Sequence, residues 1–244
     1  MRIAVISDIH GNFGALQAVL ADIARRAPDL IVNLGDVLSG PLFPVECADL
    51  LIPLNLPTIC GNHERQLLRL SFEEMGASDR YALSCLSPHH VSWIKQLPSS
   101  KSLPEGVLLV HGTPDSDITY FLETVEPSGV RMALPREVEL RLGNVCEPLI
   151  LCGHTHIPRI FQLKGRCLIV NPGSVGLPAY EDCKPMPHKI ETGSPYARYA
   201  TVEKRSGEWS AELHTIVYDW ESAARAAEER GRPDWAKALR TGLA

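Results

Sequence analysis

The start of the chain predicts a strand, a helix and a second strand, all before residue 35. Ile3–Ile6 is an uninterrupted apolar run, which is typical of a strand buried on both faces. Apolar residues then recur at helical spacing over 16–23, with Asn12 as a candidate N-cap and Pro28 beyond the helix end. Leu30–Leu34 is a second buried run. Because a helix connects the two strands, we expect them to be parallel.

The same alternation continues and indicates one α/β domain over residues 1–244. Further strands are predicted at Pro57–Cys60, Val107–Val110, Leu149–Cys152 and Cys167–Val170. Further helices are predicted at Val45–Leu51, Glu64–Leu70, Asp79–Leu86, His89–Leu97, Arg136–Leu142 and Trp220–Arg230. Arg198–Glu203 and Trp209–Val217 read as an antiparallel hairpin. The segment Leu177–Pro195 has four prolines and little periodicity, which predicts a long functional loop.

The composition excludes several classes of partner. The chain is 45% hydrophobic and 22% charged, with a formal net charge of −5. We expect no binding to polymeric nucleic acid, because that requires a basic surface. No apolar stretch has the length of a membrane span or a signal peptide, and the seven cysteines contain no CxxC pair. These features predict no membrane partner and a cytoplasmic location, and they leave the oligomeric state open.

Polar clusters follow five of the predicted strands. They are Ser7-Asp8-Ile9-His10-Gly11-Asn12, Gly35-Asp36, Gly61-Asn62-His63-Glu64, His111-Gly112 and Gly153-His154-Thr155-His156. The carboxyl ends of the strands are where α/β sheets bind ligands. Carboxylate, amide and imidazole groups bind transition-metal ions, and this set is large enough for two. Two divalent ions about 3.5–4 Å apart form a hydrolytic site for phosphate esters.

In this order, the clusters resemble the signature of the calcineurin-like metallophosphoesterase superfamily. The resemblance spans residues 8–156, and Asn171-Pro172-Gly173-Ser174 extends it to small bacterial members. It implies an α/β fold in which two β-sheets pack face to face as a β-sandwich and are flanked by helices, giving four layers.

The resemblance also implies a role for each polar residue. One metal would be held by Asp8, His10, Asp36 and His156, with Asp36 bridging, and the second would be completed by Asn62, His111 and His154. The cofactors would be two divalent transition-metal ions, Mn, Fe, Ni or Zn. His63 would be the catalytic residue that binds no metal and assists the leaving group.

The third cluster departs from the pattern of many small members, which have Asp after the catalytic histidine. This chain has Glu64 there, so the group that orients His63 is left open. We expect two substrate contacts beside the metal ligands. Asn12 is either a phosphate contact or a helix cap, and Arg65 is either a phosphate ligand or an exposed residue at a helix start.

The function implied is hydrolysis of small phosphomonoesters, phosphodiesters or nucleotides by attack of a metal-bound hydroxide. A diadenosine-tetraphosphatase-like or phosphoprotein phosphatase activity on the same centre stays open. A rival from another class is a non-catalytic scaffold with this fold, which is disfavoured because no ligand position is missing and His63 is present. A structural zinc site is also disfavoured, because no cysteines lie at a suitable spacing.

Overall fold

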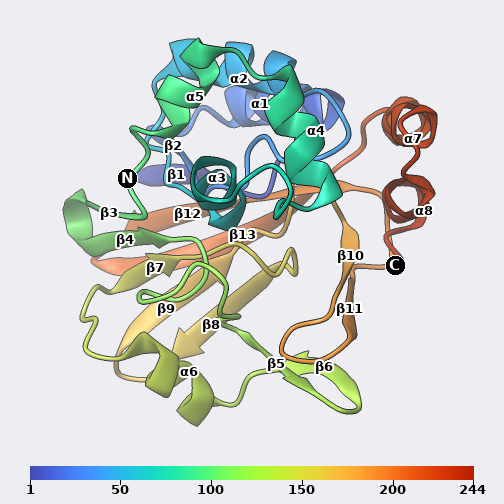
Figure 1. The fold of residues 1–244 in the computed structure, drawn as a ribbon. Coiled ribbons are helices and arrows are strands. Elements are labelled where there is room, and N and C mark those ends of the chain that lie inside the picture. The colour runs from blue at the N-terminus through green and yellow to red at the C-terminus, as the bar shows by residue number, and fades with distance from the viewer.

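The computed structural model describes residues 1–244 and contains two main β-sheets with helices on their outer faces (Figure 1). The first sheet has the order β13 (Glu208–Ile216), β12 (Ala197–Arg205), β1 (Arg2–Ile6) and β2 (Leu30–Asn33). The second has the order β3 (Ser100–Leu103), β4 (Val107–Val110), β7 (Leu149–Leu151), β9 (Cys167–Asn171) and β8 (Arg159–Leu163). Both sheets are mixed. In the first, only β1 and β2 pair in parallel, and in the second, β4, β7 and β9 form the parallel centre with antiparallel strands at both edges.

Helices cover the outer face of each sheet. The helices are α1 (Phe13–Arg26), α2 (Pro44–Leu51), α3 (Asn62–Arg69), α4 (Ala77–Cys85), α5 (Pro88–Ile94), α6 (Pro135–Leu142), α7 (Trp220–Glu229) and α8 (Pro233–Thr241). Figure 1 places α1, α2, α4 and α5 beyond the first sheet and α6 beyond the second. Two hairpins complete the chain, β5 (Glu123–Glu126) with β6 (Gly129–Met132) and β10 (Ala179–Asp182) with β11 (His188–Glu191).

Three buried apolar clusters fill the spaces between these layers. Successive residues of a strand point to opposite faces of its sheet, so β1 contributes to two clusters. Ile3 and Val5 join the cluster between the two sheets, whereas Ala4 and Ile6 join the one beneath α1, α2, α7 and α8. The third cluster lies between the second sheet and α6. The expected fold of two packed sheets flanked by helices is therefore confirmed.

The predicted unit at the chain start is also confirmed. β1 and β2 pair in parallel and α1 connects them. The side chain of Asn12 accepts a hydrogen bond from the backbone N–H of Ala15, as an N-cap does. β12 and β13 form the expected antiparallel hairpin.

Two expectations from the sequence are wrong. Pro57–Cys60 forms no strand, because only Thr58 bridges to β2, Pro57 has no N–H to donate and the N–H of Cys60 bonds to the carbonyl of Pro98. The segment Leu177–Pro195 is not an irregular loop, because it contains the hairpin of β10 and β11. None of the helices has the length and apolar character needed to cross a membrane.

Candidate metal centre

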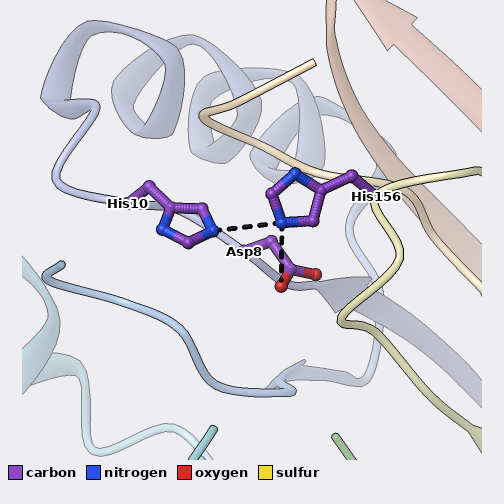
Figure 2. A group of neighbouring side chains, drawn as sticks. All are labelled: Asp8, His10 and His156. Carbon is purple, nitrogen blue, oxygen red and sulfur yellow. Dashed lines mark hydrogen bonds and ion pairs between the residues drawn. The ribbon is translucent and has the colours of Figure 1, made fainter. Parts of the chain in front are cut away.

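The predicted ligands gather in two groups where the strands end. The first group is Asp8, His10 and His156, which come from the loops after β1 and β7 (Figure 2). The second is Asp36, His111 and His154, which follow β2, β4 and β7. In each group the candidate ligand atoms lie within 4.8 Å of one another. The structure therefore contains two candidate metal sites, as a dinuclear centre requires.

Within each group the candidate ligand atoms approach one another closely. His10 Nε2 and His156 Nε2 are 3.1 Å apart, and His156 Nε2 lies 3.4 Å from Asp8 Oδ1 (Figure 2). In the second group, His111 Nε2 lies 3.1 Å from Asp36 Oδ2. The amide oxygen of Asn62, which α3 brings to this group, is also 3.1 Å from His111 Nε2.

The backbone fixes which ring nitrogen of each histidine faces the centre. The Nδ1 atoms of His10, His111 and His156 each lie within 2.8 Å of a backbone carbonyl oxygen. A carbonyl only accepts hydrogen bonds, so these Nδ1 atoms carry the proton and donate it. The Nε2 atoms are therefore turned inward, where each can bind a cation when it carries no proton. This is the usual way in which a protein orients imidazoles for a metal ion.

Asp8 supplies the strongest sign that a cation belongs in this space. Its side chain is fully buried, and Oδ1 has no hydrogen-bond partner. A buried carboxylate oxygen without a partner is costly unless a cation neutralises it. The same oxygen lies 3.4 Å from His156 Nε2 and 4.0 Å from His111 Nε2, between the two groups. The donor set thus fits two divalent cations, and the bridging role expected of Asp36 stays a prediction.

The pKa values of the histidines agree with a ligand role. Burial, aided by the nearby His156, lowers the pKa of His10 to about 3, so this ring is neutral near pH 7. Burial and the charge of His111 lower the pKa of His154 to about 4. Burial also disfavours the charged form of His111, but Asp36 outweighs it and raises the pKa of His111 to about 10. A proton on His111 therefore balances Asp36 until a cation takes its place.

The ligand loops have unusual backbone conformations. Asp8, His10, Asp36, His154 and His156 all have φ between 52° and 68°, in the left-handed region. Residues other than glycine seldom adopt this conformation, and it is concentrated at functional sites. The packing around the loops maintains the strain, and the strained turns direct the side chains inward.

Two glycines allow the backbone to approach the ligand carboxylates. A Cβ atom at Gly61 would overlap Asp36 Oδ1, and one at Gly153 would overlap the side chain of Ser7. Both glycines stand in the polar clusters found in the sequence. No other residue fits at these positions without displacing the chain around the carboxylates.

Glu64 holds two of the ligand-bearing segments together. Its carboxylate is fully buried and accepts hydrogen bonds from the backbone N–H groups of Asp36 and Val37 at 2.8 Å and of Gly61 at 3.0 Å. It therefore ties the loop after β2 to the start of α3. Asp36 and Asn62 reach the second group from these two segments.

Glu64→Gln is expected to lower the free energy of unfolding by about 1–3 kcal/mol, the cost of an unsatisfied buried polar group. One amide oxygen would replace two carboxylate oxygens, and the new NH₂ group would face backbone N–H donors. The midpoint of urea denaturation measures the change. Glu46→Gln, at an exposed position in α2, is the control. An unchanged midpoint for Glu64→Gln would show that these hydrogen bonds contribute nothing.

A cavity of about 500 Å³ opens onto the two groups. His10, Asp36, Asn62, His63, His154 and His156 line its inner wall. Its other walls come from α4, β10, α8 and the residue before α8, and include Ser78, Tyr180, Glu181, Asp182, Arg232, Trp235 and Lys237. The contribution of α8 was not expected from the sequence.

His63 lies at this cavity but contacts no ligand oxygen with its ring. Its backbone N–H donates to Asp36 Oδ1 at 3.0 Å, and its Nδ1 is 2.7 Å from Asp79 Oδ1. Burial lowers the pKa of His63, but the charges of Asp36 and Asp79 outweigh it and raise the pKa to about 9. Asp79 stands in the first turn of α4, and no motif in the sequence connects it with His63.

The structure does not bring the two expected substrate contacts to the cavity. Asn12 is fully buried, and its amide nitrogen donates to the carbonyl of Gly176 and to the hydroxyl of Tyr218. Arg65 forms a two-pronged ion pair with Asp117, so its guanidinium is already engaged. Neither residue lines the cavity.

The histidines and the arginine outside the motifs are held by structural contacts. His90 bonds to Asp49, and His214 bonds to Thr201. Tyr180 lines the cavity and donates to the carbonyl of His154. His188 does not line the cavity, and it bonds to the hydroxyl of Tyr120, which in turn bonds to the hydroxyl of Tyr180. Arg198 is buried and donates to Ser194 and to the carbonyl of Tyr196.

Comparison with known proteins finds relatives that are similar over nearly the whole chain. An uncharacterised protein of Methanocaldococcus jannaschii is 28% identical over 259 residues, covering 96% of this chain and 94% of that protein. The crystal structure of a metallophosphoesterase from Sphaerobacter thermophilus is 25% identical with a TM-score of 0.74, covering 98% of each chain. A hypothetical protein of Pyrococcus horikoshii OT3 is 19% identical with a TM-score of 0.77, covering 99% of this chain and 98% of that one.

The match to a protein family covers most of the chain. Residues 1–190 match the model of the calcineurin-like phosphoesterase superfamily domain, and this range includes both candidate metal sites. The chain belongs to the calcineurin-like phosphoesterase superfamily.

Proposed function

We propose that this protein is a dinuclear metal-dependent phosphoesterase that hydrolyses small phosphomonoesters or phosphodiesters, including nucleotides. The observation that carries the proposal is the pair of inward-facing ligand groups at the end of one cavity. When bound, two divalent cations would lower the pKa of water and offset the negative charge of the phosphate oxygens. The chain's own residues would bind the ions, position the ester and move a proton.

His63 is suited to the proton transfer. Its Nδ1 is engaged by Asp79, so Nε2 is the only ring nitrogen free to meet a substrate in the cavity. A histidine in this place can donate its proton to the oxygen of the departing group. The proton on Nδ1 is held by the Asp79 carboxylate throughout.

The size of the cavity supports a small substrate. A volume of about 500 Å³ is within the range of pockets for small molecules. One phosphoryl group at the ligand groups would leave room for an organic group of modest size between β10 and α8. We propose manganese, iron, nickel or zinc as the metal, because the mixed imidazole, carboxylate and amide donors suit these ions.

The test is a substrate panel with defined metals. Metal-free protein is loaded with Mn²⁺, Ni²⁺ or Zn²⁺ and assayed with aryl phosphomonoesters, aryl phosphodiesters, nucleoside monophosphates, diadenosine tetraphosphate and a phosphopeptide. We expect turnover of small aryl esters that stops when the metal is removed by chelation. Absence of turnover with every metal would favour the scaffold with the same fold, and preference for the phosphopeptide or the tetraphosphate would contradict the proposed substrate class.

A further inference from the structure

We propose that Asp79 is the residue that positions His63 for proton transfer, a role that rests on the proposed phosphoesterase function. Asp79 lies in the first turn of α4, is 2% exposed and places Oδ1 2.7 Å from His63 Nδ1. A hydrogen bond from an imidazole to a buried carboxylate is among the stronger hydrogen bonds in proteins. It determines which ring nitrogen carries the proton and how the ring is turned.

Glu64, the carboxylate next to His63 in sequence, is not available for this task. Its two oxygens are occupied by three backbone N–H groups, those of Asp36, Val37 and Gly61. The hydrogen bonds of the His63 ring are limited to the one with Asp79. The carboxylate that orients His63 is therefore supplied by Asp79 of α4, and not by the residue that follows His63 in the sequence.

Asp79 also connects His63 to a metal ligand. Ser39 donates its hydroxyl to the same oxygen of Asp79 at 2.5 Å, and its carbonyl accepts from His10 Nδ1 at 2.8 Å. One buried carboxylate thus bonds both to the ring of His63 and to the side chain of Ser39, whose backbone carbonyl orients His10. The His10 orientation itself depends on the Ser39 backbone, which Asp79 variants retain.

The C-terminal part of the chain holds α4 in place. Arg232, just before α8, donates from Nη1 to the hydroxyl of Ser78 at 2.9 Å, and Ser78 directly precedes Asp79. Arg232 lies beyond residues 1–190, which match the family model. The position of Asp79 therefore depends on packing between α4 and a segment outside the matched range.

The kinetic test uses esters whose leaving groups differ in basicity. Asp79→Asn and Asp79→Ala, each loaded with Mn²⁺, are compared with the wild type on phenyl phosphate and 4-nitrophenyl phosphate, or on the corresponding diesters if the wild type prefers them. We expect kcat on the phenyl ester to fall about 10- to 100-fold, with KM little changed, because its more basic leaving group needs the proton more. The loss on the nitrophenyl ester should be smaller, and the metal content should equal that of the wild type.

A double mutant separates positioning from a structural role. In a His63→Ala background, Asp79→Asn should cause no further loss, because two residues that act as a unit are not additive. Asp49→Asn is the matched control, since Asp49 makes a similar 2.9 Å contact with His90 and does not line the cavity. This control should have wild-type kcat on both esters.

A spectroscopic readout does not depend on turnover. In the metal-free protein, the His63 Nδ1 proton should give a downfield resonance that disappears in His63→Ala, is lost or moves upfield in Asp79→Ala and persists in Asp49→Asn. Equal losses of kcat on both esters, additive losses in the double mutant, loss of metal or an unchanged resonance would each overturn the role of Asp79. A wild type inactive with every metal would instead contradict the proposed function, and the resonance would still decide whether Asp79 holds His63.

Discussion

Replacing Asp36 by Asn is expected to leave the protein with one bound divalent ion instead of two and to lower kcat by about 10³-fold or more. Asp36 is the only carboxylate in the second ligand group, where it accompanies His111 and His154. A metal ion at a phosphoryl centre contributes several kcal/mol to the transition state, and each 1.36 kcal/mol is a factor of ten in rate. Elemental analysis and steady-state kinetics of the same preparation measure both effects.

The Asp36 variant needs a control for the loss of one negative charge. Asp49→Asn makes the same chemical change at a surface contact with His90, away from the cavity. It should keep two ions and full activity. If Asp36→Asn bound two ions and turned over substrate like the wild type, Asp36 would have no part in the centre.

Replacing His63 by Ala is expected to lower kcat by about 10²- to 10⁴-fold while both ions stay bound, the range typical of a general acid. The hydrogen bond from His63 to the ligand groups comes from its backbone N–H, which Ala retains. The His63 ring lies in the cavity wall and packs edge-to-face on the ring of His10, with the centroids 5.5 Å apart. The loss should be largest for esters with basic leaving groups. Kinetics on a phenyl and a nitrophenyl ester, with metal analysis, test this.

His89→Ala is the matched control for His63→Ala, because His89 is exposed and lies outside the cavity. It should change neither rate nor metal content. A His63 variant that lost its ions would point to a structural role for this histidine. A variant with wild-type kcat on both esters would remove His63 from the mechanism.

The metal ligands could be predicted from the sequence because each lies close to a pattern that can be recognised within a few residues. Asp8, Asp36, His111 and His154 each come soon after a buried apolar run, and apolar periodicity finds such runs. Once the runs are read as strands of packed sheets, their polar ends must meet at one edge. The two groups in the structure contain six of the seven predicted ligands, and Asn62 lies beside the second group.

The part that could not be predicted depends on contacts between distant segments. An aspartate in the first turn of a helix, such as Asp79, is an ordinary residue there, because it favours the helix N-terminus. Only the packing of α4 against α3 brings it to His63. Arg65 shows the opposite case, since an arginine beside a motif can bind phosphate, yet the loop after β4 places Asp117 against it.

The cavity wall illustrates the same limit. The nine residues of α8 carry an ordinary amphipathic pattern, so nothing in the sequence indicates that Trp235 and Lys237, with Arg232 just before the helix, would line the cavity. Similarly, the hairpin of β10 and β11 lies in a proline-containing segment with weak alternation. Both elements acquire their role from where the fold places them.

The central claim is that two cations lie between Asp8, His10 and His156 on one side and Asp36, His111 and His154 on the other. Anomalous diffraction from crystals grown with Mn²⁺ tests it most directly. We expect two anomalous peaks about 3.5–4 Å apart, one at each group, as in other two-metal sites. A single peak, peaks elsewhere in the molecule, or none at saturating Mn²⁺ would contradict the account.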